Sequence, residues 1–75
     1  MTGRYEEIKT FDIQKGDLIT LFPPGTEKNG VEIEPTEVMR VRTNDNRPGE
    51  VYLDMASNET WRRVDNDRQW ILLED

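Results

Sequence analysis

Cysteine and histidine are both missing from the 75 residues, and Ser57 is the only serine. Without cysteine the chain has no disulfide, no thiolate metal site and no thiol chemistry. A nucleophile activated by a histidine base is excluded as well. Acid–base catalysis by paired carboxylates such as Asp65 and Asp67 would need a cleft that shifts their pKa values, whereas turn carboxylates are usually solvated. We therefore predict that the protein is not an enzyme and uses no cofactor.

Long apolar runs are also missing. No stretch approaches the roughly 18 to 20 apolar residues of a membrane span, and the first ten residues, MTGRYEEIKT, contain no apolar signal region. We expect a soluble, cytoplasmic protein with no membrane partner. Because the chain has only 75 residues, of which 33% are hydrophobic, we expect one domain, 1–75, with a small core.

Acidic residues outnumber basic ones by 16 to 10, and every base after Lys28 is an arginine. Such a surface repels phosphate at long range, so nucleic-acid binding would require the arginines to be segregated onto one face. The acids could instead imitate phosphates and occupy a basic groove of a nucleic-acid-binding protein, as an acidic inhibitor does. Solubility is the commoner reason for an acidic surface.

Turn-forming residues recur at short intervals and separate short segments rich in β-branched and apolar residues. This pattern predicts a small all-β domain. Residues 1–9 are expected to form a loosely ordered arm or one helical turn, although Arg4 to Lys9 suits a strand equally well. Asn29-Gly30 suits a tight turn, so Thr26 to Glu34 is expected to form a projecting hairpin. Strands are expected near residues 10–13, 17–22, 31–34, 37–43, 50–55, 60–64 and 70–74.

Residues 37–43 and 50–55 predict a central hairpin, because apolar and polar residues alternate in both segments. The expected register pairs Val41 with Leu53 and Met39 with Met55. On the other face it sets Arg42 beside Tyr52 and Arg40 beside Asp54, which gives both arginines partners within the chain.

The order of these segments resembles an SH3-like small barrel of five to seven short strands, with an OB-like barrel as the alternative. The likeness depends on two features: a long irregular loop after the opening strand, and a short turn before the last strand, at Asp65 to Gln69. Two loops have similar sequences with alternating Asp and Asn: Asn44 to Arg47 and Asp65 to Arg68. Their spacing lacks the glycine and glutamate of an EF-hand, so we interpret them as turns and predict no metal site.

The stretch TWRRVDNDRQW, residues 60–70, places two tryptophans around three arginines. If it is a hairpin with Asn66-Asp67 as its two-residue loop, Trp61 faces Leu72, Arg63 faces Trp70, and both rings are exposed. If the turn is longer by an odd number of residues, one ring joins the core. We favour the second register, because burying one ring stabilises a small domain by about 2 kcal/mol. At least one tryptophan is then outside, with an arginine near it.

These observations predict a non-catalytic module that binds another macromolecule, most simply a protein, as an accessory or regulatory component. Single-stranded nucleic acid, bound by stacking on a Trp/Arg face, is the alternative partner. The small size and the acidity suit a bacterial or phage accessory protein. The residues expected to contact the partner are Trp61, Arg63, Trp70, Tyr52 and Arg42, followed by the loop from Phe22 to Gly30.

Overall fold

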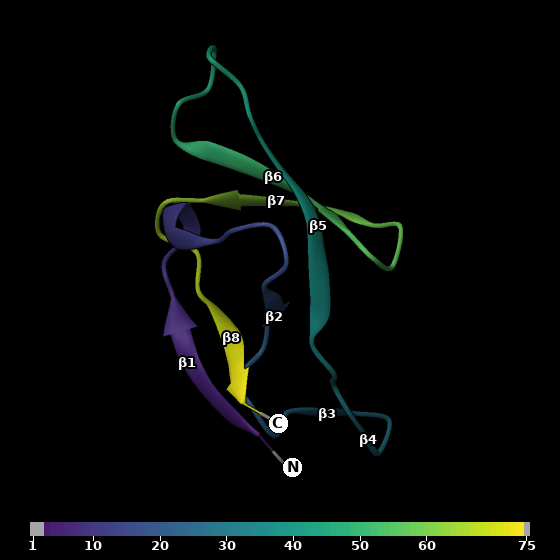
Figure 1. The fold of residues 1–75 in the computed structure, drawn as a ribbon. Helices are drawn as coiled ribbons and strands as arrows, with labels where there is room; N and C mark the ends of the chain where they lie inside the picture. Colours follow the sequence, from purple (N-terminus) through teal and green to yellow (C-terminus); the bar gives the residue numbers. More distant parts are fainter. Residues whose placement is uncertain (1–2, 75) are drawn as a thin grey trace.

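The computed structural model describes residues 3–74, which are almost entirely strands and turns (Figure 1). The predicted all-β class is therefore confirmed. The elements are β1 (Arg4–Ile8), the 3-10 turn η1 (Thr10–Asp12), β2 (Leu18–Thr20), β3 (Glu27–Lys28), β4 (Val31–Glu32), β5 (Thr36–Thr43), β6 (Glu50–Met55), β7 (Thr60–Val64) and β8 (Gln69–Glu74).

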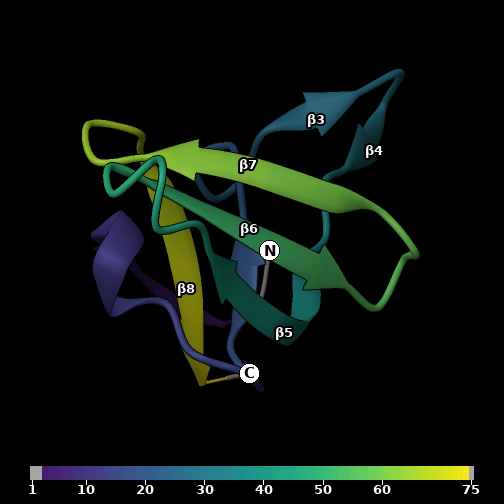
Figure 2. The ribbon, with the colours of Figure 1, turned by 90° about the horizontal axis from the view of Figure 1, so that it is seen from above.

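Six of the strands form one antiparallel sheet in the order β1-β8-β2-β5-β6-β7. Strands β1 and β7 are its two edges, and within the described residues no ladder joins them. The sheet is therefore open, and the expected closed barrel, SH3-like or OB-like, is not formed. The short strands β3 and β4 make a separate two-stranded hairpin that projects from the sheet (Figure 2).

The central hairpin, β5 and β6, has the predicted register over most of its length. Val41 pairs with Leu53, Arg42 with Tyr52 and Arg40 with Asp54. The predicted pair of Met39 and Met55 is wrong, because a bulge between Val38 and Arg40 lets Val38 pair with Met55 instead. The bulge adds one residue to β5 and turns Met39 outward, where it is 46% exposed.

The core lies on one side of the sheet and is small, as the composition predicts. Partly buried Ile8, Val41, Trp61 and Ile71 pack around it. Residues from both halves of the sheet meet here, so the core holds β2 and β8 against β5, β6 and β7. Its buried members are Ile13, Ile19, Val38, Val51, Leu53 and Met55.

The N-terminal segment differs from the expectation. The stretch that suited a strand or a helical turn is a strand, β1, which pairs with β8 from Arg4 to Ile8. Residues 1 and 2 of the expected arm lie outside the described residues. The strand expected at 10–13 is wrong, since Thr10–Asp12 is a 3-10 turn. This turn serves as an anchor, because buried Thr10 donates its hydroxyl hydrogen to the carbonyl oxygen of Val64 on β7, at 2.7 Å.

The projecting hairpin predicted around Asn29-Gly30 is confirmed. Both turn residues have positive φ, 55° and 79°, as a tight hairpin turn requires. Its strands are only two residues long, so the expected strand at 31–34 is reduced to β4.

Both registers considered for residues 60–70 are wrong, because β7 and β8 do not pair with each other. Strand β7 pairs with β6, while β8 crosses to the other half of the sheet and lies between β1 and β2. The turn between β7 and β8 therefore joins two strands that lie apart in the sheet order.

Candidate partner-binding surfaces

Strand β7 presents an unpaired backbone edge. The amide of Val64 donates to the Asp67 carboxylate at 2.8 Å, and its carbonyl accepts from Thr10, so the backbone groups of Val64 point away from β6. The carbonyl of Glu59, five residues earlier, points toward β6 and accepts from the amide of Met55. Because backbone groups alternate along a strand, those of Thr60 and Arg62 point away from β6. Another extended segment could pair with them.

A groove of about 280 Å³ lies beside this edge. Leu21 and Phe22 after β2, Ile33 before β5 and Trp61 on β7 supply its apolar lining, and the Phe22 side chain is about half exposed. Two carboxylates, those of Glu34 and Glu59, belong to the same lining. The groove thus combines an apolar floor with negative charge.

Trp61 lies where β7 faces the core. It pairs with Leu53, a fully buried residue of β6, and packs against the core cluster while remaining half-buried. Of the five residues expected to bind a partner, Trp61 is the one that the groove contains. The expected loop from Phe22 to Gly30 contributes Phe22 to the same groove.

Arg63 is engaged inside the protein. Its side chain is 15% exposed, and its Nε donates to the Gln69 amide oxygen at 3.0 Å. A second nitrogen donates to the carbonyl of Arg68 at 2.8 Å. Gln69 is fully buried and donates in turn to the carbonyl of Ile8 on β1. These hydrogen bonds connect β7 to β8 and β1, which are not joined to β7 by a backbone ladder. Arg63 therefore has a structural role.

Trp70 lies on the outer face of the other half of the sheet. It pairs with Glu7 on β1 and with Thr20 on β2. Arg68 stands over its ring, with Cζ 5.4 Å from the ring centroid, and also donates to the Glu7 carboxylate. Trp70 therefore lies outside the core with an arginine near it, as expected, but it is half-buried like Trp61.

The neighbours of Trp70 on this face are partly apolar. Residues opposite each other in an antiparallel pair share a face, as do residues two apart in one strand. Leu72 and its partner Tyr5 therefore share the face of Trp70, and Leu18 joins them through Thr20. Trp61 is directed to the core side of the sheet, so the structure does not bring the two tryptophans and Arg63 together into one stacking surface.

Tyr52 and Arg42 meet on the outer face of β5, β6 and β7. They are Cα partners, and the Arg42 Cζ lies 5.8 Å from the centroid of the Tyr52 ring. Arg42 reaches diagonally to Asp54 with two hydrogen bonds, of 2.8 and 2.9 Å. Asp54 was predicted to lie beside Arg40, and the two residues are indeed Cα partners. The ion pair nevertheless forms with Arg42, because the guanidinium group of Arg42 can bond to both carboxylate oxygens of Asp54.

Glu50 is the second carboxylate of this face, and its side chain is only 10% exposed. It accepts from Arg62 and from the Tyr52 hydroxyl, and it lies 3.5 Å from Arg47. The hydrogen bond from Arg62, followed by that from Tyr52, lowers the pKa of Glu50 to about 2. The same carboxylate raises the pKa of Tyr52, because the phenol donates to it. Tyr52 is thus held as a neutral donor with its ring fixed in place.

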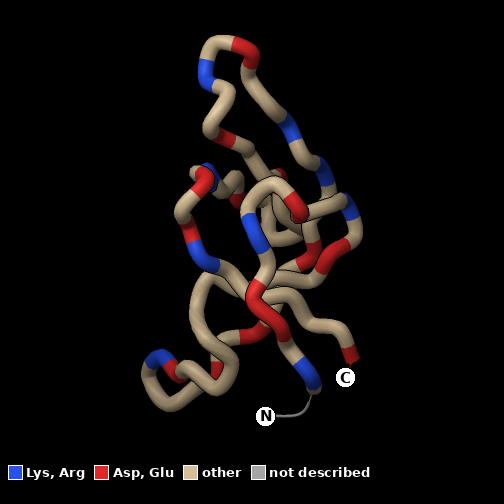
Figure 3. Tube along the Cα trace, turned by 90° about the vertical axis from the view of Figure 1, so that its left-hand side faces the viewer, with Lys and Arg blue, Asp and Glu red and all other residues tan. Residues whose placement is uncertain are grey.

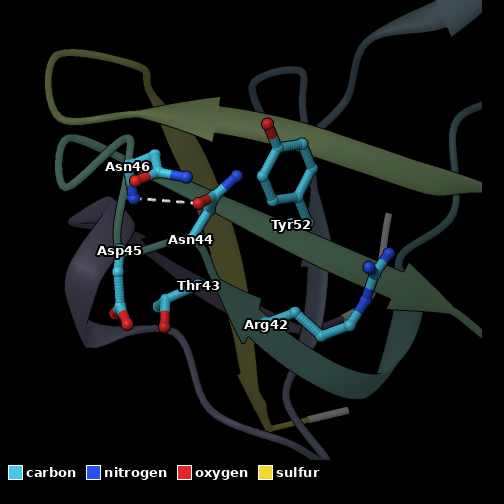
Figure 4. A pocket seen from close by; sticks show the side chains of 6 residues that line it. All are labelled: Arg42, Thr43, Asn44, Asp45, Asn46 and Tyr52. Carbon is cyan, nitrogen blue, oxygen red and sulfur yellow. Dashed lines mark hydrogen bonds between the residues drawn. The ribbon is translucent and has the colours of Figure 1, made fainter.

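A hollow of about 590 Å³ adjoins Tyr52 and Arg42 (Figure 4). The loop of residues 43–46 forms its opposite wall. Within this loop the Asn44 side-chain oxygen accepts from the amide of Asn46 at 2.9 Å, so the predicted turn role of Asn44 is confirmed. In Figure 4 the Asn44 amide extends toward the side of Tyr52, whereas the Asp45 carboxylate points away from the ring.

The sequence reasoning missed several residues of these surfaces. Gln69 and Thr10 looked like ordinary polar residues, and nothing in their local pattern indicates that they are buried. Arg40 could have been found, because it alternates with Arg42 along one strand and therefore shares its face. Glu50 could not, since its contacts come from a turn and from two strands.

Comparison of the chain with protein-family models, with curated proteins and with solved structures finds no match. No helix in residues 3–74 has the length and hydrophobicity that crossing a membrane requires.

Proposed function

We propose that the protein is a non-catalytic module that binds another protein, in an accessory or regulatory role, by adding a strand of its partner to the edge of β7. The observation that supports this most is the position of the edge: Thr60 and Arg62 offer backbone groups directly beside the groove that contains Trp61 and Phe22. Backbone pairing supplies affinity in this mode of recognition, and a neighbouring pocket supplies specificity.

The charge around the groove specifies the chemistry of the partner. An apolar side chain of the added strand would enter the groove between Phe22 and Trp61. The carboxylates of Glu34 and Glu59 favour a lysine or arginine next to that side chain. The proposed ligand is therefore an extended, proline-free segment in which an apolar residue is flanked by a basic one.

The fold that accompanies this function is an SH3-like arrangement that is left open at β7. Support comes from the long excursion between β2 and β5 and from the short turn before β8. In such an arrangement the unclosed edge is available to a partner strand.

Selection from a displayed library of random nine-residue peptides tests the proposal. We expect enrichment of peptides that carry an apolar residue beside Lys or Arg. Binding of such a peptide should slow hydrogen exchange at the amides of Thr60 and Arg62, which point outward in the free protein. Enrichment of unrelated sequences, or unchanged exchange at both amides on saturation, would contradict strand addition.

Two variants at one position separate the backbone from the side chain. Thr60→Pro removes an outward amide without breaking the ladder to β6, because proline is tolerated where the N–H faces away from the sheet. It should weaken peptide binding by about fivefold, the equivalent of one hydrogen bond of about 1 kcal/mol. Thr60→Val loses the same hydroxyl, which donates to Asp54 at 3.0 Å, but keeps the amide and should bind normally.

A further inference from the structure

The outer face of β5, β6 and β7 holds a local excess of positive charge. Arg42, Tyr52 and Arg62 lie in one row across the three strands, and Arg40 shares their face two residues before Arg42. Arg47, in the adjoining loop, lies 3.5 Å from the Glu50 carboxylate. Four guanidinium groups are thus arranged around the two carboxylates of Glu50 and Asp54. With Asp45 of the adjoining loop counted, the surplus is one positive charge in a chain of net charge −6.

The two carboxylates are already occupied. Asp54 accepts two bonds from Arg42 and a third from Thr60, and Glu50 accepts from Arg62 and Tyr52. The Arg40 side chain is exposed and makes no hydrogen bond or close ion pair within residues 3–74, although its charge helps to lower the pKa of Asp54. Among residues 3–74, the exposed side chain of Arg47 contacts a carboxylate only at Glu50, at 3.5 Å. Neither guanidinium group makes a hydrogen bond to a carboxylate, so an anionic ligand can reach these two more readily than Arg42 or Arg62.

The aromatic ring of Tyr52 lies among these guanidinium groups. Tyr52 is flanked by its cross-strand partners Arg42 and Arg62, and its hydroxyl is held by Glu50 at 2.7 Å. The hollow of about 590 Å³ beside it falls in the usual size range of small-ligand sites, roughly 300 to 1,000 Å³. The amide of Asn44 extends into the same region (Figure 4).

Nucleic-acid binding by so acidic a chain requires its arginines to be gathered on one face. Four of the seven arginines meet that condition, and Figure 3 shows several basic positions, with acidic ones between them, at the end formed by the β5–β6 hairpin. We propose that this face, which we call the Tyr52 face (Arg40, Arg42, Arg47, Tyr52 and Arg62), binds single-stranded nucleic acid. A base stacks on Tyr52, its edge bonds to Asn44, and flanking phosphates contact Arg40 and Arg47. An acidic protein segment would use the charge but neither the ring nor the amide.

This site is separate from the groove of the proposed protein-binding function. Trp61 is directed to the core side of β7, whereas Arg62, the next residue, is directed to the outer face. Thr60→Pro and Thr60→Val both remove the hydroxyl that donates to Asp54, so the two variants should bind nucleic acid equally. The two proposals fail or succeed independently.

The test is fluorescence anisotropy of labelled oligothymidylate of about ten nucleotides, a length within the range that small single-strand-binding sites cover. With two phosphates neutralised, the slope of log affinity against log salt should be about −1.4, so affinity should fall about sevenfold between 50 and 200 mM salt. An absence of binding at 50 mM salt would overturn the proposal.

Matched double variants distinguish binding by the Tyr52 face from a general effect of net charge. Arg40→Gln with Arg47→Gln should abolish most of the salt dependence, because each lost phosphate contact reduces the slope by about 0.7. Lys9→Gln with Lys15→Gln makes the same change in net charge elsewhere on the exposed surface and should alter affinity less than about twofold. Equal effects of the two doubles would show that only net charge matters and would overturn the proposal.

Two variants of Tyr52 test stacking. Tyr52→Phe keeps the ring and should retain affinity, whereas Tyr52→Leu should reduce it about tenfold. Circular dichroism of both variants confirms that each is folded before binding is compared. Poly-glutamate that competes as strongly as the oligonucleotide would identify a surface for acidic protein segments, and so would contradict the nucleic-acid assignment.

Discussion

Replacing Gln69 by methionine should destabilise the protein far more than an ordinary polar-to-apolar change. Gln69 is fully buried and has two hydrogen-bond partners on different strands: it donates to the carbonyl of Ile8 on β1 and accepts from Arg63 on β7, at 3.0 Å. Methionine has nearly the same length and volume, so little cavity is created. The effect measured is therefore that of the hydrogen bonds.

The magnitude follows from the two partners. Each lost hydrogen bond costs about 1 kcal/mol, and a part-buried carbonyl that loses its donor, as at Ile8, costs about 1 to 3 kcal/mol in total. Arg63 retains the carbonyl of Arg68 and the carboxylate of Asp67, at 3.9 Å, so its share is smaller. We expect a loss of about 2 to 4 kcal/mol. Domains of this length have a total free energy of unfolding of about 4 to 11 kcal/mol.

Urea unfolding followed by tryptophan fluorescence measures this loss. With an m-value of about 1 kcal/mol per molar urea, which is typical of small domains, the midpoint should fall by about 2 to 4 M. Gln14→Met makes the same chemical change at an exposed position and should move the midpoint by less than about 0.5 M. If the two variants shift the midpoint equally, Gln69 does not hold the halves of the sheet together and the reasoning is wrong.

Two further predictions concern charge and backbone. The pKa of Glu50 is lowered to about 2 from its ordinary value of 4.5, so the stability that its ion pairs contribute is fully present above pH 4.5 and is lost as the pH falls toward 2. Urea midpoints across this range should show that loss, and Glu50→Gln should abolish it. Gly16 has φ +94°, so Gly16→Ala should cost about 1 kcal/mol by urea unfolding, whereas Gly49→Ala, at a position without positive φ, should cost nothing. Equal effects of the two alanines would contradict this.

Local features of the fold were predictable from the sequence because they depend on residues close together in the chain. The alternation of Val41 with Arg42 and of Leu53 with Tyr52 determined which side of the central hairpin is buried, and the structure confirms it. Asn29-Gly30 specified a turn through its tolerance of positive φ. The bulge at Met39 was not predictable, since an extra residue in one strand has no signature in a pattern of period two.

The candidate surfaces were predictable only in part. Trp61, Tyr52 and Arg42 were identified by residue type, and each lies at a groove or hollow. Arg63 has the same residue type as Arg40 and Arg62, but the fold buries it against Gln69. Adjacent arginines on a strand point to opposite faces, so the sequence motif alone could not distinguish the internal one from the exposed one.

The sequence by itself determined the all-β class, the turns, the small core and the absence of histidine and cysteine chemistry, because these follow from composition and from neighbours along the chain. Only the tertiary structure decided that β8 leaves β7 and inserts between β1 and β2. That choice separates Trp61 from Trp70, opens the edge of β7 and makes Gln69 a buried link. Strand pairing at this distance is determined by which apolar faces can be buried together, a condition on the whole chain rather than on any segment of it.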